Sequence, residues 1–262
     1  MRIILLSLPR SGAKRWLAVA PILLGLAFAA SAGLFPLARG ALRPAAGALA
    51  GWRIVVDPGH GGIDGGTNRQ GLMEKDIVLD VGLKLAQFLR MQGAQVFLTR
   101  DCDMDVTQHY QGPARGRHSQ DLGGRVQFTA RVKGDLMVSL HVNSSSDPAT
   151  RGPSIYYGTR NPHSRRLAEL IYEELGEVHT RRSRFAIWPG RGLYVPSRVE
   201  VPMALVELAY ISSPADRQLL TDENFRYQAA LAIGRGIARF CAGMGRRTPA
   251  GTNPGPTAFR SS

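Results

Sequence analysis

The sequence predicts an α/β protein with a mainly parallel central sheet, helices on both faces of that sheet and a single catalytic domain. Short apolar, β-branched runs alternate along the chain with segments whose apolar residues recur at helical spacing. The runs are continuously apolar, as expected for strands that helices bury on both sides. The 262 residues, 44% of them hydrophobic, are enough for one well-filled core.

The first strand is predicted at residues 54–56 and ends at Asp57-Pro58, where proline removes a backbone donor. Apolar residues recur every three or four positions over residues 75–92, which predicts an amphipathic helix with Gly93 as its stop. A second strand is expected over residues 95–99. Residues 101–124 show little apolar periodicity and are predicted to form a surface loop.

The second half of the body continues the alternation of strands and helices. We expect a helix over residues 125–133, strands over 136–140 and 153–157, a helix over 164–178, strands over 193–195 and 203–208, and a closing amphipathic helix over 224–240.

The N-terminal segment has the pattern of an export signal. Arg10, Lys14 and Arg15 precede an uncharged stretch over residues 16–38, long enough to cross a bilayer and containing small residues that suit a signal peptidase. We therefore expect residues 1–38 to be a signal peptide or an uncleaved membrane anchor, with the remaining chain outside the cytoplasm, either secreted or membrane-anchored. Residues 39–51 would be a linker, 52–242 the catalytic domain and 243–262 a disordered tail.

Most of the net charge of +13 lies at the two ends of the chain, because the first fifty residues hold six Lys/Arg and no acid and the last twenty hold three Arg. Since the body is only weakly basic and an export segment precedes it, nucleic acid is not expected as a partner. The two cysteines, Cys102 and Cys241, exclude a disulfide framework and leave open whether they pair with each other.

A glycine-rich loop follows the first strand and contains His60. One interpretation is a phosphate cradle, but the dinucleotide-binding spacing from Gly59 would need glycine at Asp64, whose carboxylate would repel an anion. The other interpretation is a metal ligand at the carboxyl end of a strand, where open α/β sheets place their sites. A structural turn histidine is the alternative.

Two further residues are candidate partners of His60. His141 ends the predicted buried strand over 136–140, and Glu74 opens the first helix directly after the glycine loop. Because the carboxyl ends of parallel strands share one edge, these three side chains can converge, and two imidazoles with a carboxylate are the ligands of a catalytic zinc. The structural alternatives are a favourable helix-dipole interaction for Glu74 and a capped strand end for His141.

A carboxylate suited to proton transfer occurs at Glu207, inside the otherwise apolar run Ala-Leu-Val-Glu-Leu-Ala-Tyr. Burying an ionisable group there costs free energy unless the group has a partner or a function. Near a metal it could accept a proton from water and then protonate a leaving amide nitrogen. A buried salt bridge to an arginine is the structural alternative.

Four motifs resemble the zinc-dependent N-acetylmuramoyl-L-alanine amidases of bacterial cell walls: Asp-Pro-Gly-His-Gly-Gly from residue 57, Glu-Lys-Asp from 74, Ser-Leu-His-Val-Asn from 139 and Val-Glu-Leu-Ala-Tyr-Ile-Ser-Ser from 206. The resemblance covers about residues 52–242. It implies that His60, Glu74 and His141 bind one Zn²⁺ per chain, that Glu207 is the catalytic acid/base, and that the bond between the muramic lactyl group and L-alanine is hydrolysed. The chain departs from the family's usual Gly-Phe and final Asn at three positions, Ala209, Tyr210 and Ser213, where we expect effects on substrate contacts rather than on the metal.

Within that family, the N-terminal apolar segment and the absence of an appended wall-binding repeat resemble the germination-specific amidases, which act on spore cortex as a step towards muramic lactam. The alternatives are a vegetative cell-wall amidase in cell separation or turnover, and a non-catalytic peptidoglycan-binding relative, which would need a lost ligand. Peptidoglycan is the expected partner, with Arg125 and Asn143 as substrate-binding residues. An activating protein, and the membrane if residues 1–38 are uncleaved, are further expected partners.

Some relatives carry an inserted helix that blocks the zinc, between the strand with the second histidine and the next strand. Residues 142–152 are too few for such a helix and its two connections, so none is expected here.

Overall fold

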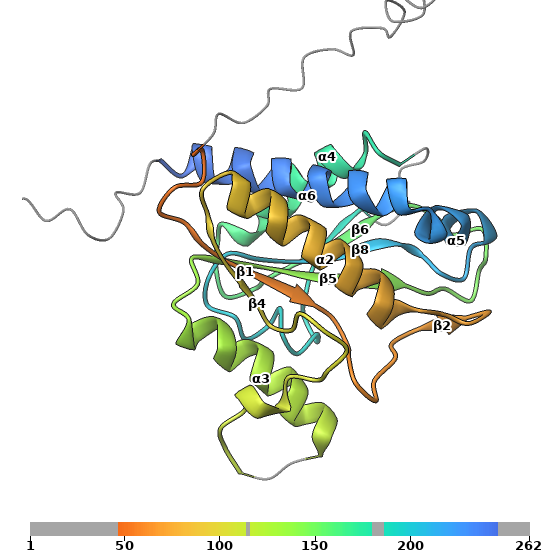
Figure 1. Ribbon diagram of the computed structural model, residues 1–262, viewed down its shortest axis with the longest axis horizontal. Coiled ribbons are helices and arrows are strands. Elements are labelled where there is room, and N and C mark those ends of the chain that lie inside the picture. Colours follow the sequence, from red (N-terminus) through yellow and green to blue (C-terminus); the bar gives the residue numbers. More distant parts are fainter. Residues whose placement is uncertain (1–46, 114–115, 180–185, 246–262) are drawn as a thin grey trace, which may run out of the picture. The chain divides into compact units, whose positions relative to one another are not determined.

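The central sheet contains β1 (Arg53–Pro58), β4 (Gln95–Leu98), β5 (Leu136–Asn143), β6 (Ser154–Tyr157), β7 (Ile187–Pro189) and β8 (Met203–Tyr210). In the computed structural model, residues 47–113, 116–179 and 186–245 are described. The strand order is β4-β1-β5-β8-β6-β7, and neighbours are parallel except β6, which runs antiparallel to β8 (Figure 1). The predicted mainly parallel sheet is confirmed.

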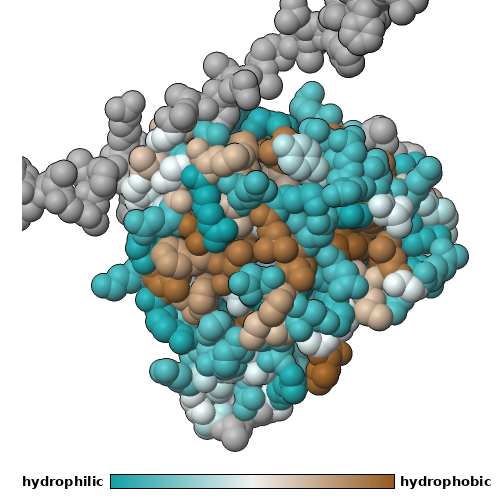
Figure 2. Space-filling model, in the orientation of Figure 1, coloured by the Kyte–Doolittle hydropathy of each residue, from teal (hydrophilic) through white to brown (hydrophobic). Residues whose placement is uncertain are grey.

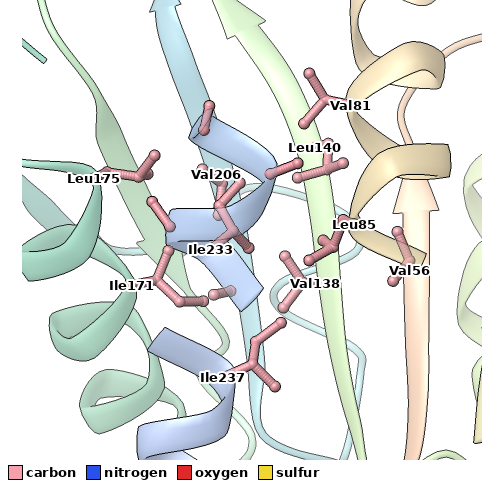
Figure 3. Close-up of a cluster of buried hydrophobic side chains, with 14 of the residues drawn as sticks. Val56, Val81, Leu85, Val138, Leu140, Ile171, Leu175, Val206, Ile233 and Ile237 are labelled. Carbon is pink, nitrogen blue, oxygen red and sulfur yellow. The ribbon is translucent and has the colours of Figure 1, made fainter. Parts of the chain in front are cut away.

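Helices cover both faces of the sheet. One face packs against α2 (Glu74–Met91), α4 (Ser164–Leu175) and α6 (Glu223–Gly243), and α3 (Arg117–Arg131) lies on the other side (Figure 1). Figure 3 shows the larger core, where Val138 and Leu140 of β5 meet Leu85 of α2 and Ile233 of α6. These side chains are buried, so the apolar runs seen in the sequence form the core that holds the strands in register.

Alternation along the strands decides which side chains reach the smaller core under α3. Val55 and Met137 belong to that core, while their neighbours Val56 and Val138 point to the larger one. Two residues further along, Asp57 and Ser139 lie on the α3 side as well, and the Ser139 hydroxyl donates a hydrogen bond of 2.6 Å to the Asp57 carboxylate. Polar residues therefore replace apolar ones on this face as the strands approach their carboxyl ends.

The start of α3 differs from the prediction. Residues 117–124 were expected in a loop but form the first half of this helix, which begins at Arg117 rather than near residue 125. The two consecutive glycines, Gly123 and Gly124, resemble a helix break in the sequence. In the structure they permit close packing, because a Cβ on Gly124 would lie 2.4 Å from the carbonyl oxygen of Val106.

Three further differences concern short elements. The prediction of a strand over residues 193–195 is wrong, because this stretch forms turns. The strand β7 begins six residues earlier, where it pairs with β6. The hairpin of β2 (Asn68–Arg69) and β3 (Leu72–Met73) and the helix α5 (Pro214–Thr221) were not predicted. The remaining predicted strands and helices are present, with ends that differ by a few residues.

The boundaries of the folded body are also revised. Leu49 was placed in a linker, but it is fully buried and its backbone N–H donates to the carbonyl oxygen of Gln92. The predicted export segment over residues 1–38 and the tail from residue 246 lie outside the described residues. Of the helices in the described part of the chain, none combines the length and apolar character of a transmembrane span.

Two surface features complete the description. Figure 2 shows apolar side chains gathered across the middle of one face and hydrophilic ones around them, and the outer strand β4 carries half-buried Val96, Phe97 and Leu98. Cys102 is exposed and Cys241 is buried, and no disulfide bond joins the two.

Candidate metal centre

Three side chains converge at the carboxyl edge of the sheet. His60 follows β1, His141 lies near the end of β5, and Glu74 is the first residue of α2. The Oε1 atom of Glu74 lies 3.0 Å from Nε2 of His60 and 3.0 Å from Nδ1 of His141. The three candidate ligand atoms all lie within 4.8 Å of one another. The structure thus brings together the three residues that the sequence placed in one site.

Glycine makes this close approach sterically feasible. A Cβ on Gly59 would lie 2.4 Å from the ring of His141, and one on Gly66 would lie 2.5 Å from the carboxylate of Glu74. His60 itself has a φ of 59°, in the left-handed region that costs energy for a residue with a side chain. The glycine-rich loop therefore allows the side chains of the three candidate ligands to pack around one point.

Hydrogen bonds orient the ligand side chains. The Nδ1 atom of His60 lies 2.8 Å from the carboxylate of Asp64, which directs Nε2 towards Glu74. The Glu74 carboxylate accepts from the backbone N–H groups of Thr67 at 2.8 Å and Val142 at 2.9 Å. A carboxylate that holds the second nitrogen of a histidine is a usual companion of a metal-bound imidazole.

The charges in this cluster shift the pKa values of His60 and Glu74 strongly. Burial by itself lowers the pKa of His60, but hydrogen bonds and charges from Glu74 and Asp64 raise it to about 9. Burial would raise the pKa of Glu74, yet the hydrogen bonds and charges of His141 and His60 hold it well below its usual range. Without a metal, the anionic carboxylate thus favours positive charge on the imidazole, which marks the position as one suited to a cation.

Glu207 lies beside the candidate ligands. It pairs in register with His141 across the parallel strands β5 and β8, so the two side chains share one face of the sheet. Its Oε2 atom is buried and has no hydrogen-bond partner among the described residues. Burial raises the pKa of Glu207 to about 7. A buried carboxyl oxygen without a partner next to a ligand cluster fits a group that meets a water or a substrate.

Arg125 does not lie where the sequence analysis expected it. Its side chain is only 3% exposed and pairs with Asp57 at 2.6 Å and Asp121 at 2.8 Å. It also donates to the carbonyl oxygens of Pro58 and His60 at 2.9 and 2.8 Å. The predicted contact with substrate is therefore corrected: this guanidinium lies beneath the metal-site loop and is committed to internal partners.

Arg100 is a second buried guanidinium beneath the same loop, and no sequence pattern indicated it. It donates to four backbone carbonyl oxygens, those of Pro58, Gly59, Lys75 and Cys102, at 2.8 to 3.0 Å. Together with Arg125 it fixes the backbone on both sides of Gly59 and up to His60. These contacts hold His60 in its unfavourable backbone conformation.

Replacing Arg125 by alanine should lower the free energy of unfolding by about 3–5 kcal/mol, because two buried carboxylates lose their partner. The loss should be full at pH 7. This destabilisation should shrink as the pH falls. The lowered pKa of Asp57 stabilises the native state at pH values above the ordinary carboxyl pKa, and that contribution is lost as Asp57 becomes protonated. Denaturant titration of the metal-free proteins measures it.

Arg165→Ala is the matched control, since Arg165 is 70% exposed and pairs with Glu169 on the surface of α4. It should cost at most about 1 kcal/mol. If the two variants were equally stable and only Arg125→Ala had a raised KM, Arg125 would be a substrate-binding residue after all.

Asn143 ends β5, two residues after His141. Its side-chain amide donates to the Ser154 hydroxyl at 3.4 Å, and its amide oxygen accepts from the backbone N–H of Ser144. It also lines a pocket beside the site. Its predicted contact with substrate stays a prediction. The connection from Ser144 to Pro153 contains no helix, as expected, so nothing from this segment forms a helical cover over the site.

The donor set suits a catalytic zinc ion. Two imidazole nitrogens and one carboxylate oxygen are three protein ligands of the types that zinc binds, and a catalytic site leaves a further position for water or substrate. His60 and His141 keep 22% and 21% of their side chains exposed, whereas Glu74 is buried. The cluster is therefore open on one side and closed on the other.

Comparison with known proteins gives consistent matches. The sequence model of the family described as N-acetylmuramoyl-L-alanine amidase matches residues 54–239. The germination-specific N-acetylmuramoyl-L-alanine amidase of Bacillus subtilis (strain 168) is 31% identical over 195 residues, which cover 73% of this chain and 81% of that protein. The amidase AmiC of Neisseria meningitidis is 29% identical over 71% of this chain, which spans about half (52%) of AmiC.

Solved structures agree with these sequence matches. The CwlD amidase from Clostridioides difficile, determined in complex with the GerS lipoprotein, superposes with a TM-score of 0.67 at 29% identity and covers 73% of this chain and 98% of that one. The amidase AmiC2 of Nostoc punctiforme gives a TM-score of 0.62 at 30% identity, with 74% and 99% covered. The sheet and its helices are thus arranged as in these two proteins.

Proposed function

The chain belongs to the N-acetylmuramoyl-L-alanine amidase family, and on this premise we propose that it cleaves peptidoglycan with a zinc ion held by His60, Glu74 and His141. The bond cleaved is the amide between the lactyl group of N-acetylmuramic acid and L-alanine. The observation that carries the proposal is the convergence of two imidazole nitrogens on one carboxylate oxygen, each at 3.0 Å, at an edge of the sheet that is open to solvent.

The proposed role of each side chain follows from the groups that it contacts. Zinc in such a site polarises the scissile carbonyl and favours deprotonation of water. His60 would be held for this role by Asp64, and Glu74 by the backbone N–H groups of Thr67 and Val142. The positive charge that the carboxylates of Glu74 and Asp64 favour at His60 would be supplied by the cation.

Glu207 would be the general base and then the general acid. Its pKa of about 7 lets it accept the proton of the attacking water at neutral pH, while the water oxygen bonds to the carbonyl carbon. When the C–N bond breaks, the same proton passes to the departing nitrogen. The products are a lactyl carboxylate on the glycan and a peptide with a free L-alanine amino group.

We further propose that the substrate is spore cortex and that the enzyme acts outside the cytoplasm. The support is the 31% identity to a germination-specific amidase over most of both chains. A vegetative wall amidase is the second candidate, supported by the similarity to AmiC. Cortex and vegetative sacculi digested side by side would distinguish the two, since a cortex amidase should release peptides faster from cortex. A non-catalytic relative is disfavoured because all three ligand positions are filled by ligand-type residues.

A protein partner is also proposed, because CwlD was determined in complex with the GerS lipoprotein. The predicted membrane attachment depends on residues 1–38, which lie outside the described part of the chain, and it stays a proposal.

The purified protein should release peptides with a free L-alanine amino terminus from sacculi and leave glycan strands without peptides. Removal of metal by a chelator should abolish this release, and added Zn²⁺ should restore it, because the zinc ion would be the Lewis acid that polarises the carbonyl and activates water. Mass spectrometry of the products and metal analysis of the protein measure both effects. New reducing sugar ends instead of free peptides would contradict the amidase assignment, and unchanged activity without metal would contradict the zinc assignment.

A further inference from the structure

A pocket of about 470 Å³ lies beside the candidate metal centre, between the carboxyl end of β5 and the strands β6 and β7. Its volume is that of a small-molecule site. The pocket combines aromatic rings with neutral hydrogen-bonding groups, contributed among others by Asn143, Ser145, Thr150, Tyr156, Trp188 and Tyr210. None of the described residues that line it carries a charged side chain.

The sheet register places this pocket next to Glu207. Tyr156 pairs with Leu205, two residues before Glu207 on β8, so the Tyr156 and Glu207 side chains lie on the same face of the sheet. The two are electrostatically coupled, since the Glu207 charge adds to burial in raising the pKa of the Tyr156 phenol. Asn143, two residues beyond His141, forms another part of the wall. A substrate whose scissile amide lies at Glu207 can therefore extend directly into the pocket.

Trp188 is the exposed aromatic residue of this pocket. Its side chain is 47% exposed, although large apolar side chains are normally buried in a folded domain. An indole held at the mouth of a pocket offers a flat apolar face. Such a face fits a ring with apolar C–H faces and polar groups around its rim.

The chemistry of the pocket distinguishes between the two halves of the proposed substrate. An N-acetylated hexosamine is neutral, has apolar C–H faces for stacking on aromatic rings, and carries hydroxyl and acetamido groups that match the amide and hydroxyls of the lining. A peptide stem carries carboxylates, which call for cationic partners. Such partners occur in a different pocket, between the β2–β3 hairpin and α5, where Arg69 and Arg217 are among the lining residues.

We propose that the pocket containing Tyr156 and Trp188 binds an N-acetylated hexosamine ring of the glycan strand, with the ring stacked on Trp188. The inference rests on the proposed function for the identity of the substrate. The glycan would then occupy the β6–β7 side of Glu207, and the pocket would select polymeric peptidoglycan over free peptides.

Binding of two probes by titration calorimetry tests this. One probe is a peptide-free glycan tetrasaccharide of alternating N-acetylglucosamine and N-acetylmuramic acid, and the other is a stem peptide with a free L-alanine amino terminus. Trp188→Ala should raise the Kd for the tetrasaccharide about tenfold and leave that for the peptide unchanged, as expected for the loss of one stacking interaction. Trp188→Phe keeps a ring and should raise it less than about threefold.

Tyr227→Ala is the matched control, since Tyr227 is a 45% exposed aromatic residue on α6 and should change neither Kd. Equal unfolding temperatures of the proteins establish that folding is unaffected. If Trp188→Ala unfolds, Trp188→Leu decides the matter, since it fills the position without a ring and should raise the tetrasaccharide Kd more than Trp188→Phe does. An unchanged tetrasaccharide Kd in Trp188→Ala, or a raised peptide Kd, overturns the proposal.

Neither probe contains the scissile amide, so binding is measured without turnover. Wild-type protein that binds the tetrasaccharide through Trp188 but releases no peptides from sacculi would refute the amidase function alone. Cleavage of sacculi with tetrasaccharide binding that does not depend on Trp188 would refute the pocket assignment alone.

Discussion

Replacing Glu207 by glutamine should slow release of peptides from peptidoglycan by at least about 100-fold, the lower end of what a general acid/base contributes. Glutamine keeps the shape of the side chain but cannot accept the proton of the attacking water or pass it to the departing nitrogen. Because the Oε2 atom of Glu207 has no hydrogen-bond partner in the described structure, the substitution removes no internal contact at that atom. Zinc content and unfolding temperature should stay near those of wild type.

The measurement is the steady-state rate of peptide release, with metal analysis of the same preparation. Glu200→Gln is the matched control, because the Glu200 side chain is 77% exposed, and its rate should equal that of wild type. Near-wild-type turnover of Glu207→Gln would contradict the assignment of Glu207 as the catalytic acid/base. Loss of zinc from it would move Glu207 into the ligand set and reopen the role of Glu74.

Replacing His141 by alanine should abolish both metal binding and activity. Two protein ligands, His60 and Glu74, would remain, and three are the usual minimum for a catalytic zinc. The Glu74 carboxylate would also lose the Nδ1 atom that lies 3.0 Å away, which leaves it with fewer contacts to hold its orientation. Metal affinity should fall by more than the roughly 10- to 100-fold typical of losing a hydrogen-bonded companion of a ligand.

Metal analysis after dialysis and a zinc titration with a competing chelator measure this effect. His163→Ala, at an exposed histidine just before α4, is the matched control and should retain full zinc and activity. Full zinc content in His141→Ala would mean that another side chain completes the site, and the proposed ligand set would then be incorrect.

Much of the fold could be predicted because its strands are buried on both sides. Residues 136–140 form a continuous apolar run, and such a run between helical segments is typical of a parallel strand. The prediction failed where tertiary contacts replaced local pattern. The polar first half of α3 is helical because Gly123 and Gly124 let it pack closely against Tyr110 and Val106, and no local periodicity reports such a contact.

The convergence of the three candidate ligands was predictable for a related reason. A histidine or glutamate directly after a strand or at the first turn of a helix lies at the carboxyl edge of a parallel sheet, whatever the details of packing. Residue type and order therefore indicated His60, Glu74 and His141 as candidate ligands, and an acidic residue inside an apolar strand indicated Glu207 as a candidate acid/base. Arg125 was misjudged because its two carboxylate partners come from different segments, and the sequence does not show that β1 and α3 meet.

The sequence by itself determined which chemical groups this protein can offer and on which edge of the sheet they lie, because side-chain chemistry and strand alternation are local properties. Only the tertiary structure decided that Glu74 contacts both histidines at 3.0 Å, that Arg100 and Arg125 support the loop from below, and that an uncharged aromatic pocket adjoins Glu207. Those facts depend on contacts between residues 14 to 67 positions apart, and such contacts are set by how the helices and loops pack on the sheet rather than by any one segment.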